Sequence, residues 1–265
     1  MTKISLATSA FNIVKNNFDI CDAIKNWKIY VDEIVIGTIP SEDNTEELLN
    51  QLGGMYDIPI KIVKIDDSTE KPGWDGRIKN AAHQASSHEI VAQVDLDERM
   101  SGKPELWRDL AGKLLENDPQ IKSLLIPSIN LWSSFYLYSD IGAKWYLSVK
   151  DGTHRGIVNF AKTLNGFDRN RSDSTEILIE GDNLAPSINF TQYTNFTDAL
   201  EYCKSDMPFV WHLGALDLSR RAKINKEFWK DCWDKYDEGE SDVVTSEKEL
   251  EKKETFEHGI EIDFL

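Results

Sequence analysis

The first hundred residues alternate between short apolar runs and segments whose apolar positions recur with helical spacing. The apolar runs have the length of strands and cover residues 3–8, 33–37, 58–65 and 89–94. Between them, helical periodicity covers residues 18–30, 46–52 and 77–86. Continuous apolar runs are typical of strands that helices cover on both faces. This order predicts an α/β fold with a mainly parallel central sheet flanked by helices, and ligands of such sheets bind beyond the carboxyl ends of the strands.

After residue 100 the chain becomes rich in aromatic residues. The pattern there predicts helices over residues 105–116, 196–203 and 222–236. It also predicts strands over 121–138 and 143–149, and a strand or loop over 210–218. We therefore expect one domain over residues 1–237, in which residues 1–100 and residues 101–237 form two halves of different character.

The last segment, residues 238–265, has a different composition. It is acidic and has few core residues before Ile260, Ile262 and Phe264. Such a composition is typical of a solvated tail. We expect the final apolar residues to dock on the body of the chain or on a partner.

Charge and cysteine content narrow the function classes. The chain has 265 residues, with 46 acidic and 30 basic side chains and a net charge of −16. Such a field repels phosphates, which argues against nucleic acid and anionic membranes, so an anionic ligand needs a metal ion or a few placed cations. Three cysteines without a CxxC pair do not suggest a disulfide framework or a zinc module. No segment resembles a signal peptide or a membrane span, so we expect a cytoplasmic protein without membrane insertion.

A pair of carboxylates follows the fourth apolar run, in Val94-Asp95-Leu96-Asp97-Glu98. Side chains two residues apart on a strand point to the same side, so Asp95 and Asp97 could converge on one Mg²⁺ or Mn²⁺ ion. Such an ion would also let an acidic protein bind an anionic nucleotide. The alternative is that both residues cap a following helix, as acidic side chains often do.

The surroundings of this pair resemble the nucleotide-sugar-binding half of a GT-A fold glycosyltransferase of the family-two type. In that family the second strand runs into a D-x-x-S-x-D-x-T pattern. Residues 38–45, TIPSEDNT, keep the serine, the second aspartate and the threonine, and Thr38 stands at the first aspartate. The family also has a basic residue and an asparagine on the helix before the DxD strand, matched by Arg77 and Asn80. The resemblance covers residues 3 to 100 and implies a Rossmann-like GT-A fold with an aromatic-rich acceptor-side half.

This resemblance also implies a donor pocket. Thr8, Ser9 and Asp43 would line the nucleoside, while Arg77 and Asn80 would hold the base or the ribose. The alternatives are ordinary strand-end and turn chemistry for Thr8 and Ser9. For Arg77, the alternative is a surface ion pair with a nearby acid such as Asp75.

The resemblance implies a metal site with Mn²⁺ or Mg²⁺ as cofactor. Asp97 would bind the ion directly, and Asp95 would reach both the ion and the ribose. In many GT-A enzymes a late histidine returns to the metal, and His212, at the end of an apolar stretch, fits that place. A basic loop then covers the diphosphate, which favours Arg221 among the cations that follow. The alternative for His212 is a core histidine beside Trp211.

An inverting transfer also needs a general base near the acceptor hydroxyl. In inverting relatives this carboxylate lies well after the DxD, at the start of a helix. The acidic segment 176–183 is the best placed, and we predict Asp182 ahead of Glu180 because Gly181 allows a tight turn that exposes it. Asp168 and Asp173 compete for the role, and each of these residues also fits a solvated loop.

Aromatic side chains of the second half could stack on an acceptor sugar, although most of them fit a core. These residues are Trp132, Phe135, Tyr136, Tyr138, Trp145 and Tyr146. We therefore expect a metal-dependent, inverting glycosyltransferase that moves a sugar from a nucleotide-diphosphate sugar to a hydroxyl of a glycan, a protein or a small molecule. One alternative is a non-catalytic nucleotide-sugar or carbohydrate-binding module of the same fold. A phosphatase resembling the haloacid dehalogenases is disfavoured, because its DxD usually sits on the first strand and Arg99 replaces its usual Thr or Val.

Overall fold

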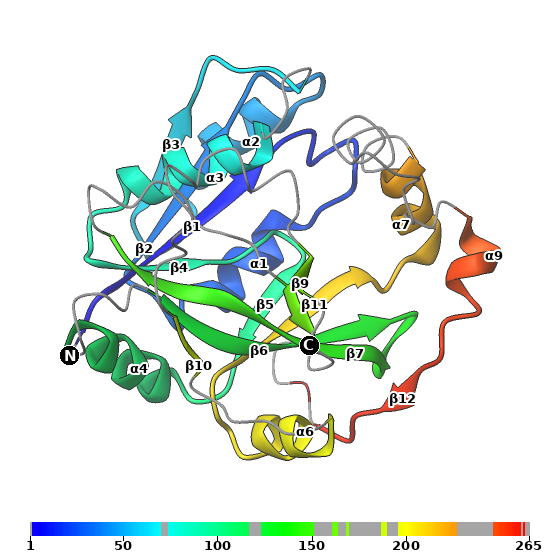
Figure 1. The fold of residues 1–265 in the computed structure, drawn as a ribbon. Helices are drawn as coiled ribbons and strands as arrows, with labels where there is room; N and C mark the ends of the chain where they lie inside the picture. Colours follow the sequence, from blue (N-terminus) through cyan, green and yellow to red (C-terminus); the bar gives the residue numbers. More distant parts are fainter. Residues whose placement is uncertain are drawn as a thin grey trace.

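The computed structural model describes residues 2–69, 74–116, 123–150, 161–163, 168–169, 187–189, 196–226, 246–260 and 262. Its main sheet has the strand order β3-β2-β1-β4-β7-β6-β11-β5 (Figure 1). These strands are β1 (Ile4–Ala10), β2 (Glu33–Thr38), β3 (Ile60–Lys64), β4 (Ile90–Gln93), β5 (Glu98–Ser101), β6 (Ser123–Trp132), β7 (Ser134–Val149) and β11 (Phe209–Ala215). Shorter strands are β8 (Ala161–Thr163), β9 (Asp168–Arg169), β10 (Ser187–Asn189) and β12 (Phe256–Glu257).

The helices follow the strands of the first half in alternation and then become sparser. They are α1 (Ile20–Trp27), α2 (Thr45–Leu52), α3 (Trp74–Ala85), α4 (Pro104–Glu116), α6 (Phe196–Lys204), α7 (Leu218–Ile224) and α9 (Glu247–Leu250). The sequence prediction of an α/β fold is therefore confirmed. None of the helices within the described ranges has both the length and the apolar character that a membrane crossing requires.

The first half is a parallel sheet buried on both faces. β1 pairs in parallel with β2 and with β4, so that Leu6 lies opposite Ile34 on one side and Ala92 on the other. These residues belong to a core cluster that also contains Trp27 of α1 and Trp107 of α4. The other face of β1, β2 and β4 packs on α3 through small and branched side chains. Two-sided burial explains why these strands read as continuous apolar runs.

Helix α3 lies unusually close to β2. A Cβ atom on Gly37 would lie 2.4 Å from the carbonyl oxygen of Ile78, a distance that any other residue would have to relieve by moving the helix. Trp74, at the start of α3, packs edge-on against Phe11 with 5.2 Å between ring centroids. Glycine on the strand and aromatic packing at the helix start therefore hold α3 against the carboxyl ends of β1 and β2.

The second half continues the same sheet with antiparallel pairs. β7 runs antiparallel to both β4 and β6, while β11 runs parallel to β6 and antiparallel to β5. The predicted single strand over 121–138 is wrong, because the chain reverses at Ser133, which has the left-handed φ of 56°. The backbone N–H of Ser133 donates to the carbonyl of Ala215 over 2.9 Å. The β6–β7 hairpin is thereby joined to the end of β11.

The described part of the final segment packs against the body of the chain. The indole N–H of Trp132 donates to the carbonyl of Leu250 over 3.0 Å, and β12 pairs with β7, Phe256 lying opposite Tyr138. Ile260 and Ile262 pack against the buried cluster that contains Trp211. Figure 1 shows this segment, in red, running along the side of the sheet that carries β11 and β7. Phe264 lies outside the described residues.

Candidate functional site

The Asp95–Glu98 segment is a tight connection between two strands at the carboxyl end of β4. The N–H of Glu98 donates to the carbonyl of Asp95 over 2.9 Å, and the N–H of Asp95 donates to the carboxylate of Glu98 over 2.8 Å. Glu98 is buried, with 1% of its surface exposed. Since β5 follows at once, the alternative that Asp95 and Asp97 cap a helix is wrong. The two aspartates lie in this turn and not within the strand itself.

Strand β11 brings His212 to Asp97. His212 pairs with Glu98 across β5 and β11, and the N–H of Leu213 donates to the carbonyl of Asp97 over 2.7 Å. The Nε2 atom of His212 lies 3.6 Å from the Oδ2 atom of Asp97. Within β11, His212 is the single residue of intermediate burial, with 20% of its side chain exposed on a strand that is otherwise apolar and buried. Two residues far apart in the sequence therefore meet at the place that the metal prediction requires.

Gly214 lets the side chains of Asp97 and His212 lie close against its backbone. A Cβ atom on Gly214 would lie 2.6 Å from Oδ2 of Asp97 and 3.1 Å from Nε2 of His212. Any side chain at this position would therefore press on both polar groups. The structure thus gives Gly214 a steric role at this site.

This arrangement fits a divalent ion in part. A carboxylate oxygen and an imidazole nitrogen suit Mn²⁺, and Mg²⁺ often binds through one or two carboxylates with substrate phosphates and water completing its shell. In the described ranges, no group of three or more His, Cys, Asp or Glu side chains could hold a metal. Asp97 and His212 could thus supply two ligands, and the remaining ligands would come from substrate or water.

Asp95 has a different neighbour. Its Oδ1 atom lies 2.9 Å from Nζ of Lys79 on α3, and the Lys79 side chain is only 10% exposed. Sequence reasoning missed Lys79 and selected Arg77. Two residues along a helix are about 200° apart around its axis, so Arg77 and Lys79 face opposite directions. Helical periodicity, applied to α3, could have identified Lys79.

Arg77 forms an ion pair on the other side of α3. Its Nε atom donates to the carboxylate of Asp67, which follows β3 and has a side chain 8% exposed. The alternative of an ion pair for Arg77 is therefore confirmed, with Asp67 as a partner. The side chain of Asp75 lies outside the described part of the chain. Because it pairs with Asp67, the Arg77 side chain points toward the β3 side of the sheet.

Three polar side chains near the carboxyl edge are buried without satisfying their hydrogen-bonding atoms. Among the described residues, no partner reaches Oγ1 of Thr8, Oδ1 of Asn80, or either polar atom of the Gln93 carboxamide. Thr8 is fully buried in β1, and Gln93, two residues before Asp95, is 3% exposed. Buried polar groups without partners are uncommon in folded proteins and often mark a site for water or ligand. Thr8 and Asn80 were predicted from the family resemblance, whereas Gln93 was not.

Asp43 is held by backbone amides of two loops. Its oxygens accept the N–H of Lys15 over 2.7 Å and the N–H of Thr45 over 2.9 Å. Burial alone would raise the pKa of Asp43, but hydrogen bonds from Thr45, Lys15 and Val14 outweigh it and lower the pKa below its ordinary value. Asp43 thus joins the loop after β1 to the start of α2.

Ser41 and Thr45, the other members of the S-x-D-x-T motif, also accept hydrogen bonds from backbone amides of the loop after β1. The hydroxyl of Ser41 accepts the N–H of Asn12 over 3.3 Å, and the hydroxyl of Thr45 accepts the N–H of Ile13 over 2.9 Å. Asn12 has a left-handed φ of 47°, a conformation that asparagine tolerates better than most residues. The motif therefore shapes the loop between β1 and α1, beside which Ser9 lies half-buried.

Helix α7 places two arginines beyond β11. Asp217 caps this helix by accepting the N–H of Arg220 over 2.9 Å. The guanidinium of Arg220 donates to the carbonyl of Asn17 over 3.1 Å and lies 5.2 Å from the centre of the Phe18 ring. These contacts bring α7 to the loop after β1, and Arg221, predicted to neutralise a diphosphate, is half-buried on the same helix.

The acceptor-side predictions are only partly described. Asp182 and Glu180, the predicted bases, lie outside the described residues, as does Asp173. Asp168 begins β9, but its side chain is not described. Of the aromatic residues, Tyr136 is 73% exposed and Tyr138 only 7%. Tyr136 is therefore available for contact, whereas Tyr138 belongs to the core.

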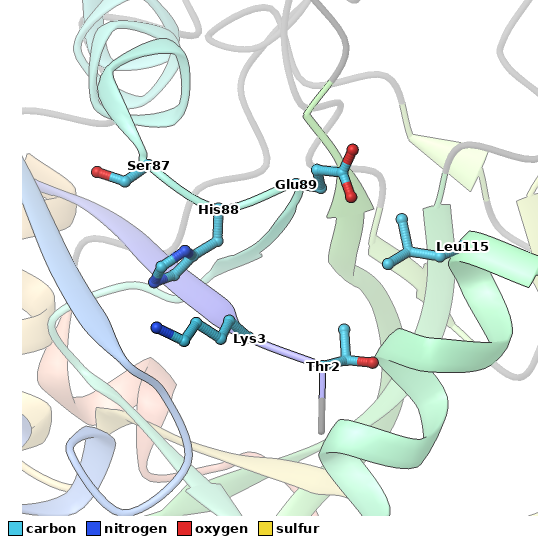
Figure 2. Close-up of a pocket in the computed structure, with 6 residues that line it drawn as sticks. All are labelled: Thr2, Lys3, Ser87, His88, Glu89 and Leu115. Carbon is cyan, nitrogen blue, oxygen red and sulfur yellow. The ribbon is translucent and has the colours of Figure 1, made fainter.

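A separate hollow lies at the opposite edge of the sheet (Figure 2). It has a volume of about 450 Å³ and is lined by Thr2, Lys3, Ser87, His88, Glu89 and Leu115. Lys3 and Glu89 immediately precede β1 and β4, so this hollow is at the amino ends of strands whose carboxyl ends lead to Thr8 and Asp95. No predicted site residue lines it.

Comparison with solved structures finds likenesses that cover about half of this chain. No family model matches the chain, and no curated protein matches it. Staphylococcus aureus TarS in complex with UDP matches with a TM-score of 0.35 and 17% identity, over 49% of this chain and 36% of that chain. Glucosyl-3-phosphoglycerate synthase from Mycobacterium tuberculosis, in complex with Mn²⁺, UDP and glucosyl-3-phosphoglycerate, matches with a TM-score of 0.30 and 23% identity, over 49% and 44% of the two chains. Both likenesses are partial, and the chain spans less than half the length of either neighbour.

Proposed function

We propose that this chain is a metal-dependent glycosyltransferase that uses a nucleoside-diphosphate sugar as donor. The observation that supports this proposal most directly is the meeting of Asp97 and His212, 3.6 Å apart, close against the backbone of Gly214. This meeting lies at the carboxyl edge of the sheet, where α/β folds bind their ligands.

Charge explains why such a site would need cations. The chain carries a net charge of −16, and Asp95 and Asp97 add negative charge at the site itself. A diphosphate would be repelled unless positive groups compensated for it. Lys79 on α3 and Arg221 on α7 are the cations that we assign to this role, together with a divalent ion.

Asp97 and His212 are the residues that would hold Mn²⁺ or Mg²⁺. The ion, when bound, would supply Lewis-acid stabilisation of the negative charge that develops on the departing diphosphate. His212 would act as a neutral imidazole, because only the unprotonated nitrogen can serve as a ligand. Arg221 would donate hydrogen bonds to the diphosphate oxygens.

The nucleoside would lie over the carboxyl ends of β1 and β4. The orphaned hydroxyl of Thr8 and the orphaned carbonyl oxygen of Asn80 support this assignment, because a ligand could satisfy them. Ser9 and Asp43 would complete the pocket. Asp43 would contribute by holding the loop after β1 in place through its hydrogen bond with the Lys15 amide. Arg77 retains a part in shaping the pocket through Asp67.

The acceptor would be a hydroxyl compound, and the transfer would invert the configuration of the sugar. A carboxylate must then accept the proton of the acceptor hydroxyl as the new glycosidic bond forms. We assign this role to Asp182, with Glu180 as the second candidate. The exposed ring of Tyr136 could support an acceptor sugar by stacking.

The proposal is tested by measuring the binding and turnover of UDP- and GDP-sugars with Mn²⁺. The wild-type chain should bind at least one donor, and Asp97→Asn should weaken that binding by tenfold or more, about 1.4 kcal/mol. Asp206→Asn, at an exposed residue paired with Lys103, is the matched control and should behave as wild type. Donor affinity that is unchanged in Asp97→Asn would refute the assigned role. Donor binding without hydrolysis or transfer would favour a non-catalytic binding module.

A further inference from the structure

Asp95 has a cationic partner within the chain. The ammonium of Lys79 lies 2.9 Å from Oδ1 of Asp95, and the two side chains are 10% and 28% exposed. An ion pair of this degree of burial is screened much less by salt than a surface pair. Two cations, Lys79 and a divalent ion, would therefore compete for the same carboxylate.

Simultaneous occupation of Asp95 by both cations is unfavourable on electrostatic grounds. Mg²⁺ binds carboxylate oxygens at about 2.0–2.1 Å, so an ion on Asp95 would lie within a few ångströms of the Lys79 ammonium. Like charges at such a distance repel strongly, and partial burial increases the repulsion. Asp97 and His212 alone would then have to hold the ion.

A bound diphosphate would reduce the repulsion between Lys79 and the divalent ion. It adds negative charge next to both cations and offers the Lys79 ammonium a new partner. The lysine side chain suits such an exchange, because it has a flexible stem and three donors that are not confined to one plane. Arg77 cannot take this part, because its guanidinium is engaged by Asp67.

We propose that Lys79 couples metal binding to donor binding at this site, an inference that rests on the proposed function. Without a donor, Lys79 holds Asp95 and weakens the binding of the metal. With a donor, Lys79 moves its charge toward the diphosphate, and Asp95 becomes able to support the ion. Donor and metal therefore bind together, and the coupling between them is reciprocal, as thermodynamic linkage requires.

Titration calorimetry with Mn²⁺ alone, and then with Mn²⁺ in the presence of saturating UDP or GDP, measures this coupling without any assay of activity. Lys79→Met removes the charge and keeps the length of the side chain. We expect it to bind Mn²⁺ alone about tenfold more tightly than wild type and to gain less affinity when the nucleotide is added. Lys79→Arg keeps the charge and should retain most of the coupling.

Lys103→Met provides a matched control. Lys103 pairs with Asp206 over 3.0 Å beyond the end of β5 that is opposite the aspartate turn, and both side chains are more than 60% exposed. This variant should bind Mn²⁺ and nucleotide as wild type does. Thermal unfolding checks that each variant is folded, and Lys79→Gln replaces Lys79→Met if the latter is not.

The outcomes separate this inference from the proposed function. Mn²⁺ affinity that is equal to or weaker than wild type in the folded, uncharged Lys79 variant overturns the coupling role while leaving the glycosyltransferase proposal intact. A wild-type chain that binds neither Mn²⁺ nor any nucleotide overturns both. Tighter binding of Mn²⁺ alone, together with reduced coupling, supports the inference.

Discussion

The backbone N–H of Leu213 donates to the carbonyl oxygen of Asp97 over 2.7 Å and joins β11 to the turn after β4. This bond is made by main-chain atoms, so it holds the two segments together whatever their side chains do. Because His212 and Gly214 flank Leu213, the same bond sets where both residues lie relative to the Asp97 carboxylate. The geometry of the candidate site therefore depends on the contact between β11 and this turn.

Gly214→Ala should damage the site with a modest effect on the fold. The added methyl would lie 2.6 Å from Oδ2 of Asp97, so the carboxylate has to move. We expect a loss of about 1–3 kcal/mol in the free energy of unfolding, typical of overpacking, and at least a tenfold loss of Mn²⁺-dependent nucleotide binding. Denaturant unfolding and calorimetry measure the two effects.

Gly53→Ala is the control for this substitution. Gly53 follows α2, and a Cβ atom there would meet nothing within 4 Å. This variant should retain wild-type nucleotide binding. Equal nucleotide affinity in Gly214→Ala and Gly53→Ala would contradict the steric role that the structure gives Gly214.

Gln93→Leu should separate ligand binding from stability. Within the described part of the chain, the buried Gln93 carboxamide has no hydrogen-bond partner, so replacing it with an apolar side chain of similar size should leave stability unchanged or raise it. If Gln93 serves a ligand, the same change should lower nucleotide affinity. We expect both results, measured by thermal unfolding and calorimetry. A variant less stable than wild type, with unchanged nucleotide affinity, would show that Gln93 has only a structural role.

The sequence predicted the sheet well where burial decides the pattern. Parallel strands covered on both faces produce uninterrupted apolar runs, so β1, β2 and β4 could be located to within a few residues. The hairpin at Ser133 could not be located in this way. Serine is a weaker turn former than asparagine or aspartate, and apolar residues continue on both sides of it.

The sequence suggested Asp97 from the carboxylate pair and His212 from the family resemblance, and the structure places the two side chains 3.6 Å apart. Their role as metal ligands stays a prediction. Lys79 was missed because a motif match names positions along the chain, whereas contact depends on the direction of each side chain around α3. Gln93 was missed because only the structure reveals that a buried amide has no partner in the described ranges.

Asp43→Asn should lower stability in a pH-dependent manner. Hydrogen bonds lower the pKa of Asp43, so its carboxylate stabilises the fold at pH values above the ordinary aspartate pKa, and this contribution is lost as the pH falls through the lowered value. We expect a cost of about 1–2 kcal/mol at pH 7, because asparagine retains an acceptor but not the charge. Unfolding at pH 7 and pH 3 should show a smaller difference between variant and wild type at the lower pH. A difference that does not change with pH would contradict the role of the charge.

His258 should make the docking of the final segment sensitive to acid. Its Nε2 atom lies 2.7 Å from the carbonyl of Phe135, and its Nδ1 atom accepts the N–H of Ile260 over 3.0 Å, which requires a neutral ring. The ring also packs on Trp211, with 4.9 Å between centroids. Burial lowers the pKa of His258, the charge of Lys204 lowers it further, and the hydrogen bond to Phe135 opposes both.

The lowered pKa of His258 determines in which direction pH changes the docking of the final segment. The neutral ring stabilises docking at pH values above the ordinary histidine pKa of about 6.5, and this stabilisation is lost as the pH falls through the lowered pKa. Hydrogen exchange of residues 256–260 should therefore be slow at pH 7.5 and, once corrected for the intrinsic pH dependence of exchange, much faster near pH 5. His258→Gln keeps hydrogen-bonding capacity and cannot be protonated, so its corrected exchange should change little between the two conditions. Parallel changes in wild type and His258→Gln would assign the acid sensitivity to another group, because a side chain that does not titrate cannot produce it.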